Sequence, residues 1–203
     1  MYLALPFLSG YLLGSVSFAL LLARARGIDL RSVGSGNLGA TNTSRALGSG
    51  AGLLVFLLDA AKGAIPVLVW ASLDSEPLAA VLAGAGAYLG HIWPVYLGFR
   101  GGKGVATLIG ALLALAPWTI LTVAPIALAS VLITRIMSLG SLVLGLGLPI
   151  ASALRGDPVE VLGFSAGAGL FLFWTHRSNI RRLLAGEENR LGAKKQASSN
   201  DAA

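Results

Sequence analysis

The sequence contains no cysteine and only two histidines among its 203 residues. The lack of cysteine excludes disulfide bonds and thiolate catalysis, and so few histidines argue against a metal site built from imidazole ligands. Charged residues are also scarce, at 12% of the chain, whereas a soluble domain typically has about 25%. Hydrophobic residues make up 55% of the chain, and a soluble protein of this size could not bury all of their side chains. The sequence therefore predicts an integral membrane protein.

Long apolar segments account for most of the chain. A helix that crosses the hydrocarbon core needs about 20 apolar residues, and fewer where the bilayer thins. The segment between Lys103 and Arg135 would be too long for one crossing as a single helix, so we divide it near Pro117. We therefore expect an all-α, polytopic membrane helical bundle with seven transmembrane helices, at 3–23, 51–73, 78–98, 105–117, 119–134, 138–154 and 159–175.

Basic residues are distributed unequally between the two ends of these spans. With seven spans, every lysine and arginine falls at one end except Lys62, which lies inside a span, and Arg155. The positive-inside rule then places the N-terminus outside and the C-terminus in the cytoplasm. The N-terminal stretch from Met1 to Ala23 lacks the basic start and the small-residue cleavage site of a signal peptide, so we expect it to remain as a span. We expect one domain over 1–192 and a disordered cytoplasmic tail over 193–203.

Three polar segments fall on the predicted cytoplasmic side. The first runs from Gly34 to Asn42 with the sequence Gly-Ser-Gly-Asn-Leu-Gly-Ala-Thr-Asn, and Arg45 follows it. Glycines allow the backbone to turn its N–H groups inward, while the serine, asparagine and threonine side chains add donors and acceptors. An arginine can bind phosphate through two parallel hydrogen bonds. The alternative for this segment is a flexible surface loop.

The second segment combines His-Ile-Trp-Pro at 91–94 with Phe-Arg-Gly-Gly-Lys-Gly-Val-Ala-Thr at 99–107. A glycine turn that opens directly into a helix is a suitable anion site, because free N–H groups and the helix dipole both favour negative charge. It is not a Walker loop, since glycine occupies position 104 where that motif needs serine or threonine, so no nucleotide is indicated. Alternatively, Arg100 and Lys103 only follow the positive-inside bias.

The third segment begins with His176 at the exit of the last span. On a helix, His176, Asn179 and Arg182 recur on one face that can point back into the bundle. The alternative is an amphipathic helix whose basic residues face anionic lipid. We favour that alternative for Arg177 and Arg181, but not for His176 and Asn179.

A few polar residues lie inside the predicted spans. Asp59 and Lys62 are three residues apart, so they can pair and neutralise each other, either as part of a functional site or to fix the helices. Ser138 and Ser141 begin the sixth span next to Arg135, although serines are also common in helix contacts within membranes.

Together these residues resemble the motifs of the bacterial acyl-phosphate-dependent glycerol-3-phosphate acyltransferases, the PlsY family. The resemblance rests on Ser-Gly-Asn-x-Gly-Ala-Thr-Asn at 35–42, on His-x-x-Pro followed by Phe-x-Gly-Gly-Lys-Gly-Val-Ala-Thr at 91–107, and on His-x-x-Asn-Ile-x-Arg-Leu-Leu-x-Gly-x-Glu at 176–188. It extends to the Asp59 and Lys62-Gly63 pair and to Ser-Leu-Gly-Ser at 138–141, and covers nearly the whole chain.

This resemblance implies an acyltransferase of the bacterial cytoplasmic (inner) membrane with its active site at the cytoplasmic face. The family moves a fatty acyl group from acyl-phosphate to the 1-hydroxyl of sn-glycerol 3-phosphate, giving lysophosphatidic acid and inorganic phosphate, the first step of phospholipid synthesis. We expect these two substrates and the lipid bilayer as partners, and no cofactor, metal, nucleotide or nucleic acid.

The resemblance and the residue chemistry together give a set of expected site residues. We expect catalytic roles for Ser35, Arg45, Lys103, His176 and Asn179. The same five should bind substrate or phosphate, together with Gly36, Asn37, Gly39, Thr41, Asn42, Gly101, Gly102, Gly104, Thr107 and Ser141. Supporting or structural roles are expected for Asp59, Lys62, His91, Arg182 and Glu188. Either His176 or the phosphate of the substrate accepts the hydroxyl proton.

Two other functions fit parts of this pattern. A small transporter or anion channel could use Asp59 and Lys62 to line its path, but it would need polar groups near the middle of several spans. A non-catalytic scaffold could bind acidic lipids, but it would not require uncharged Asn37, Asn42 and Asn179.

Overall fold

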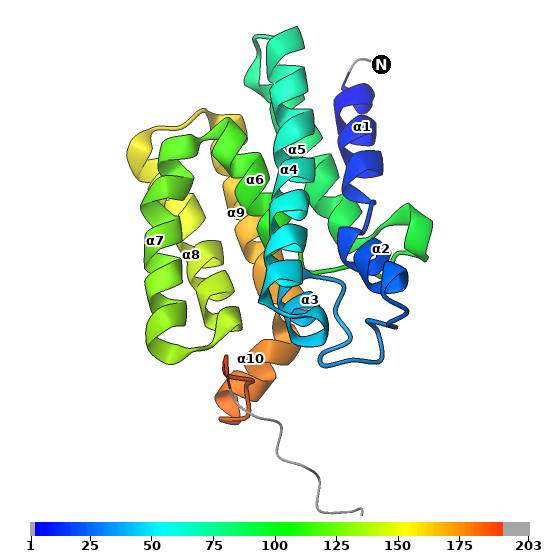
Figure 1. Cartoon of the computed structure of the whole chain (residues 1–203). Helices are drawn as coiled ribbons and strands as arrows, with labels where there is room; N and C mark the ends of the chain where they lie inside the picture. Colours follow the sequence, from blue (N-terminus) through cyan, green and yellow to red (C-terminus); the bar gives the residue numbers. More distant parts are fainter. Residues whose placement is uncertain (1–2, 193–203) are drawn as a thin grey trace, which may run out of the picture.

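The computed structural model describes residues 3–192, all of which are helical or in loops. The helices are α1 (Ala4–Gly14), α2 (Phe18–Ala25), α3 (Ala40–Leu47), α4 (Ser49–Leu73), α5 (Pro77–Ile92), the short η1 (Val95–Leu97), α6 (Val105–Leu115), α7 (Pro117–Thr134), α8 (Met137–Arg155), α9 (Val159–Thr175) and α10 (Arg177–Leu184) (Figure 1). The predicted all-α class is confirmed for this part of the chain, whereas the predicted tail lies outside the described residues.

Five helical stretches are long and apolar enough to cross a membrane, namely Ala4–Ala25, Ser49–Leu73, Pro77–Leu97, Pro117–Thr134 and Met137–Arg155. Two shorter apolar helices, α6 and α9, occupy the positions of the fourth and last predicted spans. The chain turns at Ala116 between α6 and α7, so the stretch that we divided does form two helices. The number of crossings and the orientation stay predictions.

The structure differs from the predicted spans in two places. The first span is interrupted after Gly14 and resumes at Phe18, where the Ser17 hydroxyl caps α2 by accepting a hydrogen bond from the Leu20 N–H. The third predicted span reached residue 98, but α5 ends at Ile92. Pro94 explains this end, because a proline disfavours helical geometry in the residue before it and has no N–H to donate.

A further difference concerns the first polar segment, of which only part is a loop. Helix α3 begins at Ala40, so Thr41 and Asn42 are helical. The backbone is extended at Gly39, whose carbonyl accepts hydrogen bonds from both the N–H and the hydroxyl of Thr43. A helix of eight residues is too short to give a clear periodic signal in the sequence.

Small residues bring the helices close together. Helix α1 lies along α5 with Gly10 and Gly14 against the backbone of Ala83 and Ala87, where a Cβ atom on either glycine would collide. Such contacts are typical of membrane helices, because small residues let two backbones approach. Helices α7, α8 and α9 pack in sequence beside this group, and apolar side chains of α5 to α9 form the largest buried cluster.

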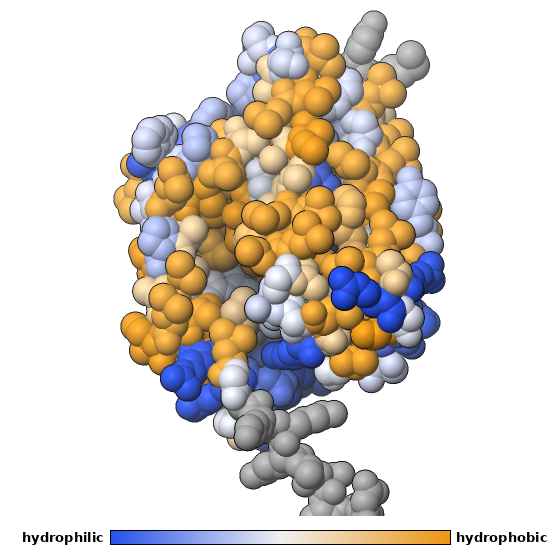
Figure 2. Space-filling model, viewed as in Figure 1, coloured by the Kyte–Doolittle hydropathy of each residue, from blue (hydrophilic) through white to orange (hydrophobic). Residues whose placement is uncertain are grey.

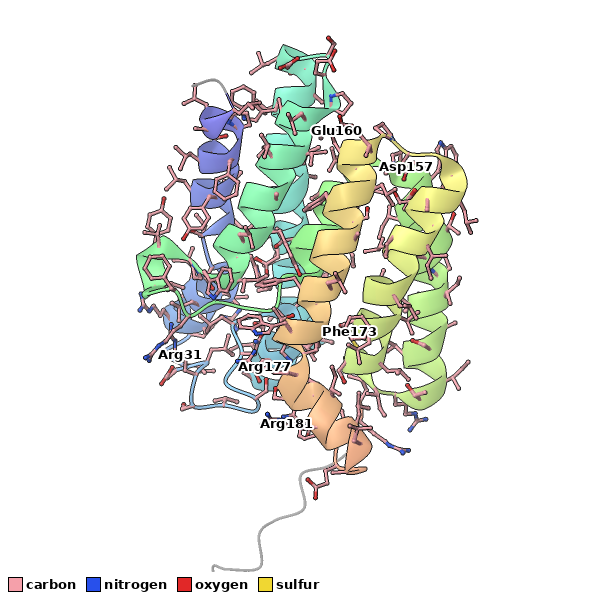
Figure 3. All side chains as sticks on the ribbon, turned by 180° about the vertical axis from the view of Figure 1, so that it is seen from behind. Arg31, Asp157, Glu160, Phe173, Arg177 and Arg181 are labelled. Carbon is pink, nitrogen blue, oxygen red and sulfur yellow. The ribbon has the colours of Figure 1, made fainter. Side chains whose placement is uncertain are left out.

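Charge is divided between the two ends of the bundle. Apolar residues cover the middle of the surface, and hydrophilic residues gather at its lower end (Figure 2). Figure 3 shows Arg31, Arg177 and Arg181 near that end and the acidic residues Asp157 and Glu160 at the opposite end. The separation of charge predicted from the sequence is therefore present in the fold.

Candidate active site

The three polar segments meet at the basic end of the bundle. A cavity of about 150 Å³ is lined by residues from all three, together with residues of α4 and α8. From the predicted set it contains Ser35, Asn37, Gly39, Thr41, Asn42, Arg45, Asp59, His91, Lys103, Gly104, Ser141, His176, Asn179, Arg182 and Glu188. An adjoining opening of about 570 Å³ shares Lys103 with it and is also lined by Gly36, Gly101 and Gly102. Segments that are far apart in the chain thus form one site.

Thr107 and Lys62 do not line either space. Thr107 is fully buried, and its backbone carbonyl packs where a Cβ atom on Gly63 of α4 would stand. The predicted substrate contact of Thr107 therefore gains no support from its position, since the residue is buried in the first turn of α6 and packs against α4. Lys62 is also buried.

The first loop is organised by the Asn42 side chain. Its Oδ1 accepts a hydrogen bond of 2.9 Å from the Ser35 N–H, and its Nδ2 donates to the carbonyls of Leu30 and Val33 at 3.1 and 3.0 Å. Asn42 is 1% exposed, so these contacts are shielded from water. We expected Asn42 to bind substrate, but its amide is engaged by the loop, which it holds in position.

The glycine turn of the second segment is attached to the end of α5. The N–H groups of Gly101 and Gly102 donate to the carbonyls of Ile92 and His91 at 3.1 and 3.0 Å. They are therefore not free to bind an anion, contrary to our expectation of a backbone cradle there. Helix α6 starts directly after Gly104, and its residues Val105 and Ala106 line the cavity. The first N–H groups of a helix have no partner within the helix, so the start of α6 is the remaining backbone site for an anion.

Lys103 projects from this turn into the cavity. Its ammonium donates a hydrogen bond to the Asn179 side chain of α10. Burial lowers the pKa of Lys103 to about 8, with the nearby positive charges of Arg182 and Arg45 acting in the same direction and Glu188 opposing them. Three cations therefore lie close to one another around the cavity, and an anion bound there would relieve their mutual repulsion.

Glu188 anchors the third segment. Its carboxylate accepts hydrogen bonds from Asn179, Arg182 and Ser138 at 2.6, 2.7 and 3.0 Å. Burial opposes its ionisation, but these three donors outweigh it and hold the pKa of Glu188 below its usual value. Asn179 thus bridges Glu188 and Lys103, so the carboxylate sets the position of both the amide and the ammonium.

His176 lies between α9 and α10 and is 3% exposed. Its Nδ1 is 2.9 Å from the Leu172 carbonyl, which can only accept, so Nδ1 carries the proton and Nε2 is left as an acceptor. Burial, followed by the positive charge of Lys103, lowers the pKa of His176 to about 4. The imidazole is therefore uncharged at neutral pH.

Several residues lining the site were not predicted. Asn189 lines both spaces, while Phe56 and Met137 give the smaller cavity an apolar wall. No pattern singled them out, because Asn189 follows the quoted motif and the other two are ordinary apolar residues of helices. By contrast, Arg177 and Arg181 are exposed, and the guanidinium of Arg177 lies 4.5 Å over the ring of Trp174 (Figure 3).

Comparison with known proteins identifies the family. The family model described as glycerol-3-phosphate acyltransferase matches residues 4–186. The glycerol-3-phosphate acyltransferase of Shouchella clausii is 46% identical to the chain, over 92% of this chain and 95% of that protein. The glycerol-3-phosphate acyltransferase of Myxococcus xanthus is 47% identical, over 90% of this chain and 96% of that protein.

Solved structures agree with this relationship. The crystal structure of PlsY (YgiH), an integral membrane glycerol 3-phosphate acyltransferase, in its glycerol 3-phosphate form is similar with a TM-score of 0.88 and 40% identity, over 94% of this chain and 96% of that chain. Its lysophosphatidic acid form has a TM-score of 0.86 and 39% identity, over 94% and 95%. The chain therefore belongs to the PlsY family of integral membrane glycerol-3-phosphate acyltransferases.

Proposed function

We propose that this glycerol-3-phosphate acyltransferase uses acyl-phosphate as its donor, acylates the 1-hydroxyl of sn-glycerol 3-phosphate, and releases lysophosphatidic acid and inorganic phosphate. It acts at the cytoplasmic face of the bacterial inner membrane, through seven spans with the N-terminus outside. The observation that carries the donor assignment is the group of Arg45, Lys103 and Arg182 around a cavity with an apolar wall. Such a group suits substrates that both carry phosphate.

The shape of the site suits one water-soluble and one lipid substrate. The opening of about 570 Å³ carries Lys103, Arg177 and Arg181 and provides a polar route for glycerol 3-phosphate. A groove of about 1160 Å³ continues from Arg45 past the apolar side chains of Leu53 and Phe56. The surface is hollowed between α4 and the α7–α8 pair (Figure 2), which gives a fatty chain a path from the bilayer.

The geometry supports direct transfer between the two substrates. The glycerol oxygen forms a bond to the acyl carbon, the bond from that carbon to the phosphate oxygen breaks, and phosphate leaves with the electron pair. An acyl-phosphate is already activated, so holding the reactants in place can supply about 7–11 kcal/mol of the barrier reduction. Each donor to the developing negative charge adds about 3 kcal/mol. Lys103 and Arg45 stabilise that charge, and the Ser35 hydroxyl orients the phosphate.

The hydroxyl proton passes to the substrate phosphate in this proposal, while His176 orients the hydroxyl through Nε2. An imidazole with a pKa of about 4 is a weak base at neutral pH, whereas a phosphate has a second pKa of about 6.

We expect His176→Gln to lower kcat by about tenfold, because the glutamine amide can still accept a hydrogen bond but with poorer geometry. The measurement is kcat at saturating substrates between pH 5 and 8, with thermal unfolding as the control for folding. A loss of a thousandfold or more in a folded variant would assign the base to His176 instead.

The donor is tested by supplying purified protein in lipid nanodiscs with labelled glycerol 3-phosphate and one of three donors, palmitoyl-phosphate, palmitoyl-CoA or palmitoyl-acyl carrier protein. We expect labelled lysophosphatidic acid with palmitoyl-phosphate alone. Product formed from palmitoyl-CoA but not from palmitoyl-phosphate would reject the donor assignment and leave the family activity intact.

A transport function is less compatible with the structure. Asp59 and Lys62 pair with each other at 2.8 Å, as predicted, and the lysine lies outside the cavity. The polar residues of the site gather at one end of the bundle and do not form a path through several spans. The acyltransferase therefore remains the function that the geometry supports best.

A further inference from the structure

Lys62 has contacts that substrate binding does not explain. It lies in the middle of α4 and is 2% exposed. Its ammonium is 2.8 Å from a carboxylate oxygen of Asp59 and donates a second hydrogen bond of 2.7 Å to the carbonyl of Val16. His91 completes the group, with Nδ1 3.7 Å from the same Asp59 oxygen. Burying such charges in a membrane helix is costly, so their arrangement calls for a reason.

The contact with Val16 is made at the break in the first span. Helix α1 ends at Gly14 and α2 begins at Phe18, so Val16 belongs to neither helix. Carbonyl groups at the end of a helix lack partners within the helix, and inside a membrane water cannot replace them. The Lys62 ammonium satisfies one carbonyl at this break and thereby fixes the point from which α2 departs.

Helix α2 in turn supports the first loop of the active site. Ala19 and Ala23 of α2 are fully buried in a cluster with Leu30 and Leu38, which precede and follow Ser35 in the chain. Because Ser35 lies between these two leucines, a displacement of α2 would displace the Ser35 loop as well.

His91 connects this group to the second polar segment. The His91 carbonyl accepts the hydrogen bond from the Gly102 N–H at 3.0 Å. The His91 ring also lies so close to Gly102 that a Cβ atom there would not fit. Gly102 directly precedes Lys103, so the position of His91 determines where the catalytic ammonium enters the cavity.

We propose that Lys62 is a positioning residue that joins the α1–α2 break to the Asp59–His91 pair, and so holds the Ser35 loop and the Lys103 turn at a fixed separation across the cavity. Lys62 does this without touching substrate, since it lies outside the cavity. The inference rests on the proposed function for its kinetic consequence, but its structural part stands independently of the donor.

The test uses the variant Asp59→Asn/Lys62→Met, which removes both charges and leaves no unpaired buried ion. We expect a thermal midpoint close to that of the parent, a rise of about tenfold in KM for glycerol 3-phosphate and a smaller fall in kcat. Amide hydrogen exchange, measured without substrate, should become faster in residues 16–38 and 99–104. A purely stabilising role would leave the KM and the exchange in these two segments unchanged.

Trp70→Phe is the matched control. Trp70 also joins α4 to α1, through a hydrogen bond of 2.9 Å from its indole N–H to the Ser9 hydroxyl, but it lies near the C-terminal end of α4, about two turns beyond Lys62. This variant should keep the parental KM and the parental exchange in both segments. The same changes in Trp70→Phe as in the double variant would overturn the proposal, because they would show a general response to loosening α4 from α1.

The remaining outcomes are also decisive. A folded double variant with parental KM and parental exchange overturns the proposal. If the double variant does not fold, His91→Gln is tested instead, because it alters only the connection to the second polar segment. Amide exchange in residues 99–104 must then become faster. Unchanged exchange in these residues overturns the proposal. A parent protein that transfers no acyl group from acyl-phosphate would refute the donor assignment, while the exchange result would still decide the role of Lys62.

Discussion

Replacing Lys103 with alanine is expected to reduce kcat/KM by about a thousandfold. Lys103 is the residue on which the three polar segments converge, since it leaves the glycine turn, lines both spaces and donates to Asn179. Its loss removes a positive charge that the proposed mechanism places at the reacting phosphate, and a hydrogen bond to Asn179 of α10. Steady-state kinetics with palmitoyl-phosphate and glycerol 3-phosphate measure the effect.

The pH dependence gives this prediction a second readout. Burial lowers the pKa of Lys103 to about 8, so the side chain is charged below that pH and neutral above it. The proposed mechanism needs the charged form, so we expect kcat/KM to fall as pH rises through about 8. The profile of kcat should fall at a higher pH, because bound phosphate stabilises the cation and raises its pKa in the complex.

Lys103→Arg is the matched variant for the pH effect. Arginine stays charged throughout this range, so the variant should lose part of its activity to altered geometry but show no fall in kcat/KM near pH 8. Thermal unfolding of both variants controls for folding. A fall near pH 8 that persists in Lys103→Arg would show that another group causes it, and parental kinetics in Lys103→Ala would remove the residue from the site.

The sequence predicted the helices and the meeting of the three segments because both depend on strong local signals. Apolar runs between Gly, Pro and charged residues mark most helices, and the unequal distribution of basic residues brings the loops to one end. The pairing of Asp59 with Lys62 followed from helical spacing and the cost of buried charge. These features require no knowledge of how the helices pack.

Other features of the site depend on contacts between distant segments. The N–H groups of Gly101 and Gly102 looked free in the sequence, but they bond to the end of α5. Asn42 looked like a ligand residue, but its amide holds the first loop. Thr107 follows Lys103 by only four residues, yet it is buried and packs against α4. Which partner a polar group finds is decided by the tertiary fold, which no local pattern contains.

The break in the first span shows the same limit. The predicted span 3–23 contains no charged residue, and the stretch Ala4–Ala25 has a mean hydropathy of 1.8, so hydropathy gives no reason to divide it. The structure divides it between Gly14 and Phe18, where the Lys62 ammonium from α4 and the Ser17 hydroxyl both satisfy backbone groups. A partner from another helix stabilises this break, and that partner becomes visible only in three dimensions.

Arg45→Ala should also lower kcat/KM by about a thousandfold, but with almost no change in stability. Arg45 lies on α3, where it lines both the cavity and the groove toward the bilayer. Within residues 3–192 its guanidinium forms no ion pair, so its removal breaks no native bridge. An arginine without a carboxylate partner in a cavity shared with Lys103 is suited to hold the phosphate of the proposed acyl-phosphate donor through two parallel hydrogen bonds.

Two further variants distinguish phosphate binding by Arg45 from a general effect of positive charge. Arg45→Lys keeps the charge but loses the paired geometry, so it should recover only part of the activity and stay about tenfold below the parent. Arg26→Ala removes an exposed arginine at the same end of the bundle, outside the cavity, and should keep parental kinetics. Equal losses in Arg26→Ala and Arg45→Ala would mean that surface charge, acting on anionic substrates at a distance, accounts for the effect. If only Arg45→Ala lowers kcat/KM, and does so at high salt as well as at low salt, Arg45 acts within the cavity. Salt screens interactions made across open solvent much more than interactions between buried groups.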